Sequence, residues 1–276
     1  ANHIFKLGGN VYAFDSTTID LCLSVFWWAK FRKKKGGIKV HTLYDVETQI
    51  PAFFHITEAS VHDSKVMIEI PYEPSSYYIF DRGYNNFKIL YKIHQIEAYF
   101  VVRAKKNLGY KSIQWKRRLP KNVLSDASVF LTGFYPKQYY PEPLRLVKYW
   151  DEEQEREFTF ITNAMHISAL QVAELYKNRW QVELFFKWLK QHLKIKRFWG
   201  TTENAVRIQI YAAICAYCLV AIIQHDMQLN RSTYEVLQIL SISLTDKTHL
   251  RDLFDKTKFQ NDKERFGPNG PSLFNF

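Results

Sequence analysis

Cysteine is scarce in this 276-residue chain, which has only Cys22, Cys215 and Cys218. Three cysteines cannot build a framework of several disulfides, so we expect a reducing compartment. Cys215 and Cys218 have C-x-x-C spacing, but their surroundings form an apolar helical run without a second Cys/His pair. We therefore interpret them as buried small hydrophobic residues and not as a zinc or redox site.

Long apolar runs are also scarce. Residues 210–223 form an apolar run shorter than the roughly 18 residues that span a bilayer, and we interpret it as a core helix. The first residues have no signal-peptide pattern. These two absences predict no membrane partner and a cytoplasmic location. Because Ala1 is not a natural start, we expect that an N-terminal part has been lost or removed.

Positive charge and aromatic side chains are abundant. The formal net charge is +11 and the sequence pI is near 9.4, which favours a polyanionic partner. The chain has 17 Tyr, 21 Phe and 7 Trp, and aromatic rings stack on bases. Together they indicate nucleic-acid binding; an aromatic core under a basic surface is the alternative.

Residues 167–197 predict one long helix. Ser168 is a plausible N-cap, and the segment contains neither Gly nor Pro. Its helical periodicity gathers four polar residues on one face: Tyr176, Arg179, Glu183 and Lys190. Lys187, Lys194, Lys196 and Arg197 add positive charge. A lone Glu among cations suits a metal ligand beside a phosphate backbone, whereas the structural alternative is a surface helix with i,i+4 ion pairs.

Two predicted strands each end in an aspartate. Residues 10–14 predict a strand that ends at Asp15, and residues 77–80 predict a buried strand that ends at Asp81. After Asp81, Gly83 allows a tight turn into a helix over residues 85–95. A turn or cap is the alternative role for Asp15, and Asp20, Asp45 and Asp63 are competing carboxylates.

The order of elements predicts an α/β fold. Residues 38–44 and 51–57 predict an antiparallel hairpin, residues 60–70 a short helix, and residues 98–103 a fifth strand. Three meandering strands followed by helix-linked strands describe a mixed five-stranded sheet flanked by helices. The basic run at residues 32–35 is either a phosphate contact or a solvated turn.

The remaining segments predict a domain organisation. Residues 1–103 form the first part of the core, and residues 104–164 form a basic, β-rich insertion that either reaches DNA or is a structural flap. Residues 165–258 complete the core with further helices over 203–224, 232–244 and 248–254. Residues 259–276 are a polar tail.

The three acids Asp15, Asp81 and Glu183 are expected to meet. Adjacent strand ends bring the two aspartates together, and a helix laid beside them adds the glutamate. Three carboxylates repel one another unless cations neutralise them, and hard oxygen ligands suit Mg²⁺ or Mn²⁺. Two such ions could activate a water or a 3′-hydroxyl and stabilise the leaving oxygen in phosphoryl transfer.

The spacing Tyr176-x2-Arg179-x3-Glu183-x6-Lys190 resembles the Tyr-Arg-Glu-Lys signature of bacterial insertion-sequence transposases of the DDE type. Asp15-Ser16-Thr17 and Asp81-Arg82-Gly83-Tyr84 resemble their earlier motifs. The resemblance covers about residues 11–223. It implies an RNase H-like core with a β-strand insertion before the last catalytic helix. The metal-binding catalytic acids would be Asp15, Asp81 and Glu183.

The resemblance also implies the partners. Tyr176, Arg179 and Lys190 would contact DNA phosphates or support the catalytic glutamate, with Lys187 and Lys194 as further DNA contacts. The expected function is metal-dependent cleavage at transposon ends and strand transfer, by a homodimer on double-stranded DNA in the bacterial nucleoid. The alternatives are an RNase H-like nuclease or resolvase without strand transfer, and a non-catalytic DNA-binding relic.

Overall fold

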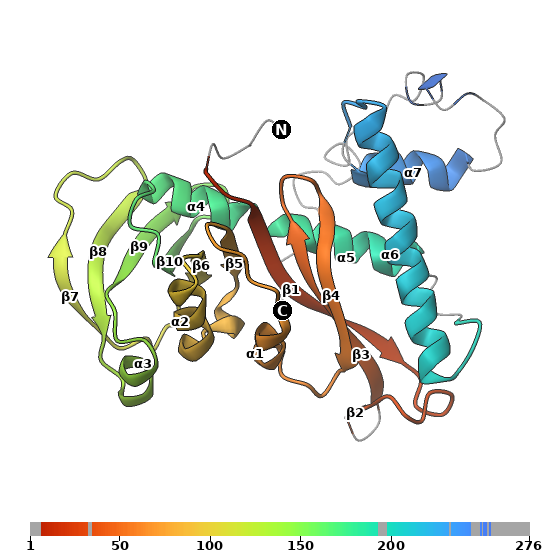
Figure 1. The fold of residues 1–276 in the computed structure, drawn as a ribbon, viewed down its shortest axis with the longest axis horizontal. Coiled ribbons are helices and arrows are strands. Elements are labelled where there is room, and N and C mark those ends of the chain that lie inside the picture. Colours follow the sequence, from red (N-terminus) through yellow and green to blue (C-terminus); the bar gives the residue numbers. More distant parts are fainter. Residues whose placement is uncertain are drawn as a thin grey trace. The chain divides into compact units, whose positions relative to one another are not determined.

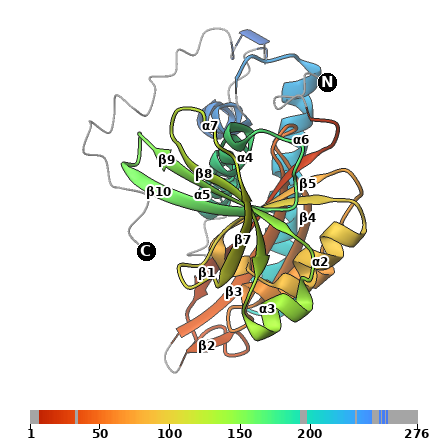
Figure 2. The same ribbon diagram turned by 90° about the vertical axis from the view of Figure 1, so that its left-hand side faces the viewer.

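The computed structural model describes residues 7–32, 35–192, 198–231 and 233–243, together with 249, 251, 252 and 254. It divides into two compact units, residues 1–214 and 215–276. The first unit contains a large mixed sheet with helices on both faces (Figures 1 and 2). Side chains of the basic run at residues 32–35, the positions of Lys194, Lys196 and Arg197, and the tail lie outside the described residues.

The first five strands of the core pair in the order β4-β3-β1-β5-β6. Their bounds are Val11–Leu21 for β1, Lys35–Asp45 for β3, Ile50–Glu58 for β4, Tyr77–Phe80 for β5 and Tyr99–Arg103 for β6. β3 runs antiparallel to both β1 and β4, whereas β5 is parallel to β1 and to β6. The predicted meander, the hairpin and the helix-linked strands are therefore confirmed.

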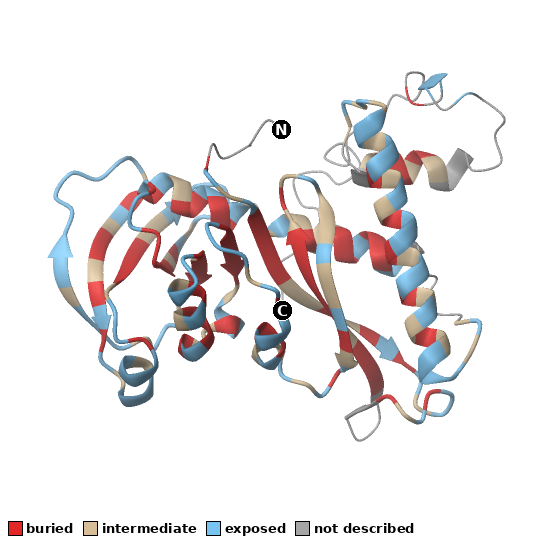
Figure 3. Cartoon of the chain, in the orientation of Figure 1, coloured by how far each residue is buried: buried red, intermediate tan, exposed pale blue. Residues whose placement is uncertain are grey.

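The prediction of only five strands is wrong, because the inserted segment continues the same sheet. β10 (Arg156–Thr162) pairs with β6, and β9 (Leu144–Asp151), β8 (Val123–Leu131) and β7 (Tyr110–Trp115) follow in order. With the short β2 (Lys30–Arg32) on β3, the sheet has ten strands among the described residues. β7 forms the outer edge and is exposed along its length (Figure 3). If β6 were an edge strand, its outer backbone N–H and C=O groups would have no partners. β10 supplies hydrogen bonds to them.

Short helices and a buried core cover one face of this sheet. α1 (Asp63–Val66), α2 (Phe87–Gln95) and α3 (Phe134–Tyr139) connect the strands. α2 begins at the N-cap Asn86, whose side chain accepts from the Ile89 N–H. Its apolar side packs on alternate residues of the central strands, and the shared cluster includes Phe14, Phe80, Leu90, Ile93, Phe100 and Val102.

The opposite face holds α4 (Ala169–Lys177) and α5 (Trp180–His192). Ser168 caps α4 through a capping box with Gln171, as its sequence predicts. The prediction of one helix over residues 167–197 is wrong, because α4 ends at Lys177 and α5 begins at Trp180. The Asn178 side chain donates to the Glu174 carbonyl, which also accepts the Asn178 backbone N–H, and it accepts from the Gln181 side chain.

Helix α6 (Glu203–Asp226) crosses the boundary between the two units, and α7 (Thr233–Ser243) follows it. By length and composition alone α6 could cross a membrane, with a mean hydropathy of 2.0; 28% of its apolar window is buried. The prediction that residues 210–223 form a core helix is therefore wrong, because most of this apolar window is not buried. Cys215 is exposed and Cys218 is half-buried, so Cys215 is not the buried small residue that we expected.

Candidate active site

The carboxyl end of β5 lies beside the middle of β1. Their parallel pairing ends at Phe14 and Phe80, so Asp15 and Asp81 are the next residues of two neighbouring strands. Asp81 follows its strand, as predicted, and begins the 3₁₀ turn Arg82–Tyr84. The prediction that Asp15 ends a strand is wrong, because antiparallel pairing with β3 carries β1 on to Leu21. That pairing holds Asp15 rigidly within the sheet.

Arg179 joins two of the expected acids. Its Nη1 lies 2.6 Å from Asp15 Oδ2, and its Nη2 lies 2.5 Å from Glu183 Oε1. The Arg179 side chain is 12% exposed, against 22% for Asp15 and 36% for Glu183. Arg179 belongs to the two-residue break between α4 and α5, and Glu183 lies one turn into α5. The guanidinium of Arg179, in this break, thus lies between the carboxylates of Asp15 and Glu183.

The third acid is held by a tyrosine and an arginine. The Tyr176 hydroxyl donates to Asp81 Oδ1 over 2.8 Å, and its ring packs on Phe158 and Phe160 of β10. Arg103 at the end of β6 places its Nη1 4.0 Å from the same oxygen. The inserted strand β10 therefore supports the tyrosine that holds Asp81. Sequence reasoning missed Arg103, although it ends the strand next to β5.

The surroundings shift the pKa values of the two aspartates in opposite directions. Burial raises the pKa of Asp15 to about 6, and Glu183 and Asp81 add to this, while Arg179 opposes it. Burial also acts to raise the pKa of Asp81, but the Arg82 N–H, Arg179, Tyr176 and Arg103 together lower it. Several negative charges therefore face one small volume and need cations.

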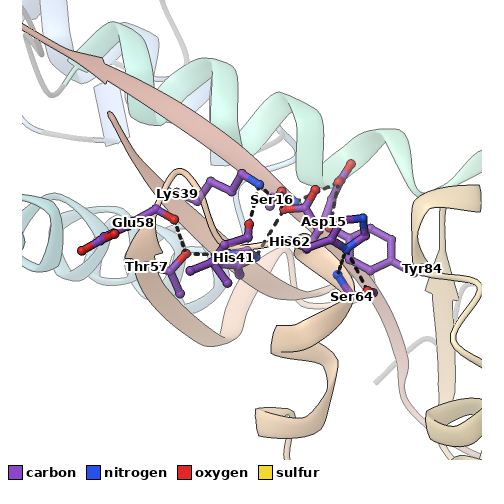
Figure 4. A network of polar contacts seen from close by, with 11 residues as sticks. Asp15, Ser16, Lys39, His41, Thr57, Glu58, His62, Ser64 and Tyr84 are labelled. Atoms are coloured by element: carbon purple, nitrogen blue, oxygen red, sulfur yellow. Dashed lines mark hydrogen bonds and ion pairs between the residues drawn. The ribbon is translucent and has the colours of Figure 1, made fainter. Parts of the chain in front are cut away.

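A second polar network adjoins Asp15 along β1 (Figure 4). The Ser16 hydroxyl donates to Asp63 Oδ1 over 2.8 Å, and Lys39 Nζ lies 2.9 Å from the same oxygen. The Tyr84 hydroxyl donates to Asp15 Oδ1 over 3.4 Å. Asp63, one of the competing carboxylates, is thus paired with Lys39 and lies outside the group around Arg179.

A buried hydroxyl stands opposite Asp15. Thr42 is the partner of Asp15 in the β1–β3 ladder, so the two side chains lie on one face of the sheet. Thr42 is fully buried, and its Oγ1 has no hydrogen-bond partner among the described residues. Sequence reasoning missed Thr42, because only the strand register identifies it as the neighbour of Asp15.

The structure thus brings together Asp15, Asp81, Tyr176, Arg179 and Glu183. Lys187 and Lys190 are exposed on α5 and make no contact with these acids among the described residues. Within that part of the chain, no three His, Cys, Asp or Glu side chains are close enough to hold a metal ion. The carboxylates and the unpartnered Thr42 hydroxyl are hard oxygen donors that fit Mg²⁺ or Mn²⁺ in their chemistry. The cation that joins Asp15 and Glu183 here is Arg179.

Comparisons with known proteins identify relatives. Residues 6–219 match the family described as transposase DDE domain. The protein y4zB of Sinorhizobium fredii, described as a transposase, is 37% identical over 246 residues, which cover 87% of this chain and 67% of that protein. A protein of Geobacillus stearothermophilus, described as a transposase for the insertion sequence element IS5377, is 31% identical over 205 residues. That alignment covers 74% of this chain and 54% of the relative, so the chain spans about half to two thirds of these proteins.

A solved structure has a similar arrangement at low identity. It is a cryo-EM structure of a piggyBac transposase synaptic complex with hairpin DNA, and it is 14% identical, with a TM-score of 0.46. The likeness covers 92% of this chain and 55% of that one.

Proposed function

This chain belongs to the transposase DDE domain family, and from that premise we propose that it cuts DNA at the ends of an insertion sequence and joins the 3′ ends to a target. Asp15, Asp81 and Glu183 are the catalytic acids of this proposal. The observation that supports it is the Arg179 guanidinium, which bonds Asp15 and Glu183 in the site where Tyr176 holds Asp81. Members of the family generally use divalent metal ions.

The three acids would hold Mg²⁺ or Mn²⁺, with two ions as the proposed number. When bound, such ions activate the attacking hydroxyl and stabilise the leaving oxygen of an in-line phosphoryl transfer. The chain's own residues prepare the site for this. Tyr176 and Arg103 orient Asp81, the strand register fixes Asp15, and Arg179 neutralises Asp15 and Glu183.

The spacing of Tyr176, Arg179, Glu183 and Lys190 is proposed as the Tyr-Arg-Glu-Lys signature. In this assignment Tyr176 and Arg179 support the acids in the DNA-free chain. Lys187 and Lys190, exposed on α5, would contact DNA phosphates. Lys194, the further contact expected from the sequence, lies outside the described residues.

The five core strands β4-β3-β1-β5-β6 support an RNase H-like core. Residues 1–103 and 165–258 would form this core, residues 104–164 the insertion, and residues 259–276 a tail. We further propose a homodimer on double-stranded DNA in the bacterial nucleoid. The net charge of +11 supports DNA as the partner.

Nicking of supercoiled plasmid DNA in the presence of Mg²⁺ or Mn²⁺ tests the proposal. We expect Glu183→Gln to abolish nicking while DNA binding stays nearly unchanged, because the substitution removes a charge but little volume. Glu174→Gln is the matched control, since Glu174 is exposed on α4 away from the acids. Nicking by Glu183→Gln at the normal rate would overturn the assignment. Joining of pre-cleaved ends to a target separates a transposase from a nuclease that only cuts.

A further inference from the structure

A basic cavity of about 260 Å³ lies beside the candidate active site. Its lining includes five cationic residues and one carboxylate: Arg82, Arg103, Lys105, Lys106, Lys148 and Glu157. Glu157 lies 3.5 Å from Lys148, and Arg103 lies 4.0 Å from Asp81, so two of the five positive charges are paired. The exposed residues Arg82, Lys105 and Lys106 have no side-chain ion pair among the described residues.

The cavity lies next to Asp81, because residues that are close to Asp81 in the sequence and in the sheet line it. Arg82 follows Asp81 directly after β5, and Arg103 ends the neighbouring parallel strand β6. The carboxyl ends of parallel neighbours share one edge of a sheet, where ligands of open α/β sheets bind. Arg103 spans the two sites, since it lines the cavity and also lies 4.0 Å from Asp81.

The segment after β6 is held in place as a wall of the cavity. The Ala104 N–H donates to the Thr159 carbonyl of β10 over 2.8 Å, and the Leu108 N–H donates to the Lys105 carbonyl over 3.1 Å. Lys105 and Lys106 therefore extend from a turn anchored to the sheet. Clustered like charges repel one another and do not favour folding, so an anionic ligand accounts for the arrangement better than stability does.

We propose that this cavity binds the phosphodiester backbone of one DNA strand, next to the site formed by Asp15, Asp81 and Glu183. This inference rests on the proposed function. A 260 Å³ cavity is smaller than the usual 300–1,000 Å³ of ligand pockets and cannot admit a duplex, so it takes backbone phosphate and sugar of a single strand. Its cations supply the phosphate contacts, and the charge of Glu157 is already offset by Lys148.

The test compares two pairs of exposed lysines. Lys105→Gln/Lys106→Gln removes two charges from the cavity, and Lys88→Gln/Lys92→Gln removes two from α2, where neither residue lines the cavity. Binding of a fluorescein-labelled single-stranded oligonucleotide is followed by anisotropy at a series of salt concentrations. Loss of two phosphate contacts lowers the slope of log K against log salt by about 1.4 for a single strand. We expect that loss in the cavity variant and less than half of it in the control.

A photo-cross-linking residue provides a second measurement. In place of Tyr110, which lines the cavity and is 37% exposed, it should cross-link to the oligonucleotide. In place of Leu124, which is 49% exposed and outside the cavity, it should not. Equal salt slopes for the two lysine pairs, together with equal cross-linking at positions 110 and 124, would overturn the cavity as a DNA site. Plasmid nicking by the unmodified chain would in that case still support the proposed function. A chain that neither binds nor cuts DNA would overturn both.

Discussion

Arg179 Nη1 lies 2.6 Å from Asp15 Oδ2, and the same guanidinium bonds Glu183. A side chain from the break between α4 and α5 thus neutralises a carboxylate in the middle of β1, 164 residues earlier in the chain. Such charge-assisted bonds are stronger than neutral ones. In the DNA-free chain Arg179 is therefore the counter-ion of the candidate active site, and its removal leaves Asp15 and Glu183 without this partner.

Arg179→Met tests the role of Arg179 as counter-ion of Asp15 and Glu183. Because both carboxylates are partly solvated, we expect a loss of roughly 2 kcal/mol in the free energy of unfolding at pH 7, less than for a fully buried pair. Millimolar Mg²⁺ should raise the melting temperature of this variant more than that of the unmodified chain, since a second cation can now occupy the site. Arg207→Met is the control, because Arg207 pairs with Glu203 away from the acids. An equal response to Mg²⁺ in both variants would contradict the prediction.

Tyr176→Phe tests the support of Asp81. The change removes one hydrogen bond to a charged group, which contributes about 1.5–3 kcal/mol, and keeps the packing of the ring on Phe158 and Phe160. We expect the nicking rate to fall while the far-UV circular dichroism stays unchanged. Tyr176→Leu, which also loses the ring contacts, should lower the melting temperature further. Unchanged nicking by Tyr176→Phe would show that the hydroxyl does not position Asp81.

Thr42→Val tests the buried hydroxyl beside Asp15. Removal of an unpartnered buried hydroxyl with little change of shape should stabilise the fold by up to about 1–3 kcal/mol. If the hydroxyl serves the acids, nicking should fall at the same time. Ser125→Ala is the matched control, because Ser125 Oγ is also buried without a partner but lies in β8. A loss of nicking in both variants, or in neither, would remove Thr42 from the site.

Asp126→Asn tests a buried ion pair within the inserted strands. Asp126 accepts two bonds from Arg145, over 2.8 and 2.7 Å, and Lys116 lies 3.1 Å away. Burial acts to raise the pKa of Asp126, but Arg145 and Lys116 lower it overall. The variant should lose about 3–5 kcal/mol of unfolding free energy at pH 7, because Arg145 stays buried without its partner.

The sign of the pH dependence follows from the lowered pKa. The contribution of Asp126 is fully present above its unfolded pKa of about 3.9 and is lost as the pH falls through the folded pKa. Denaturant titrations between pH 7 and pH 3 should therefore show the difference between the unmodified chain and Asp126→Asn shrinking below about pH 4. A constant difference across this range would contradict the prediction.

Local patterns in the sequence determined the elements that depend on short-range chemistry. The apolar run of β5, the hairpin of β3 and β4, the Ser168 cap and the position of Asp81 after its strand are all as predicted. Each of these depends on side-chain alternation or on hydrogen bonds within a few residues. Helical periodicity also predicted that Tyr176, Arg179 and Glu183 face a common side.

Only the tertiary structure decided which distant groups meet. The length of β1, the ten-stranded sheet and the neighbour Thr42 depend on pairing between remote segments, whose register no local pattern specifies. Composition favoured an unbroken helix, whereas the structure breaks it at Asn178 and Arg179. Arg179, which lies in that break, bonds both Asp15 and Glu183. Helical periodicity alone predicted the i,i+4 pair with Glu183 and not the bond to Asp15.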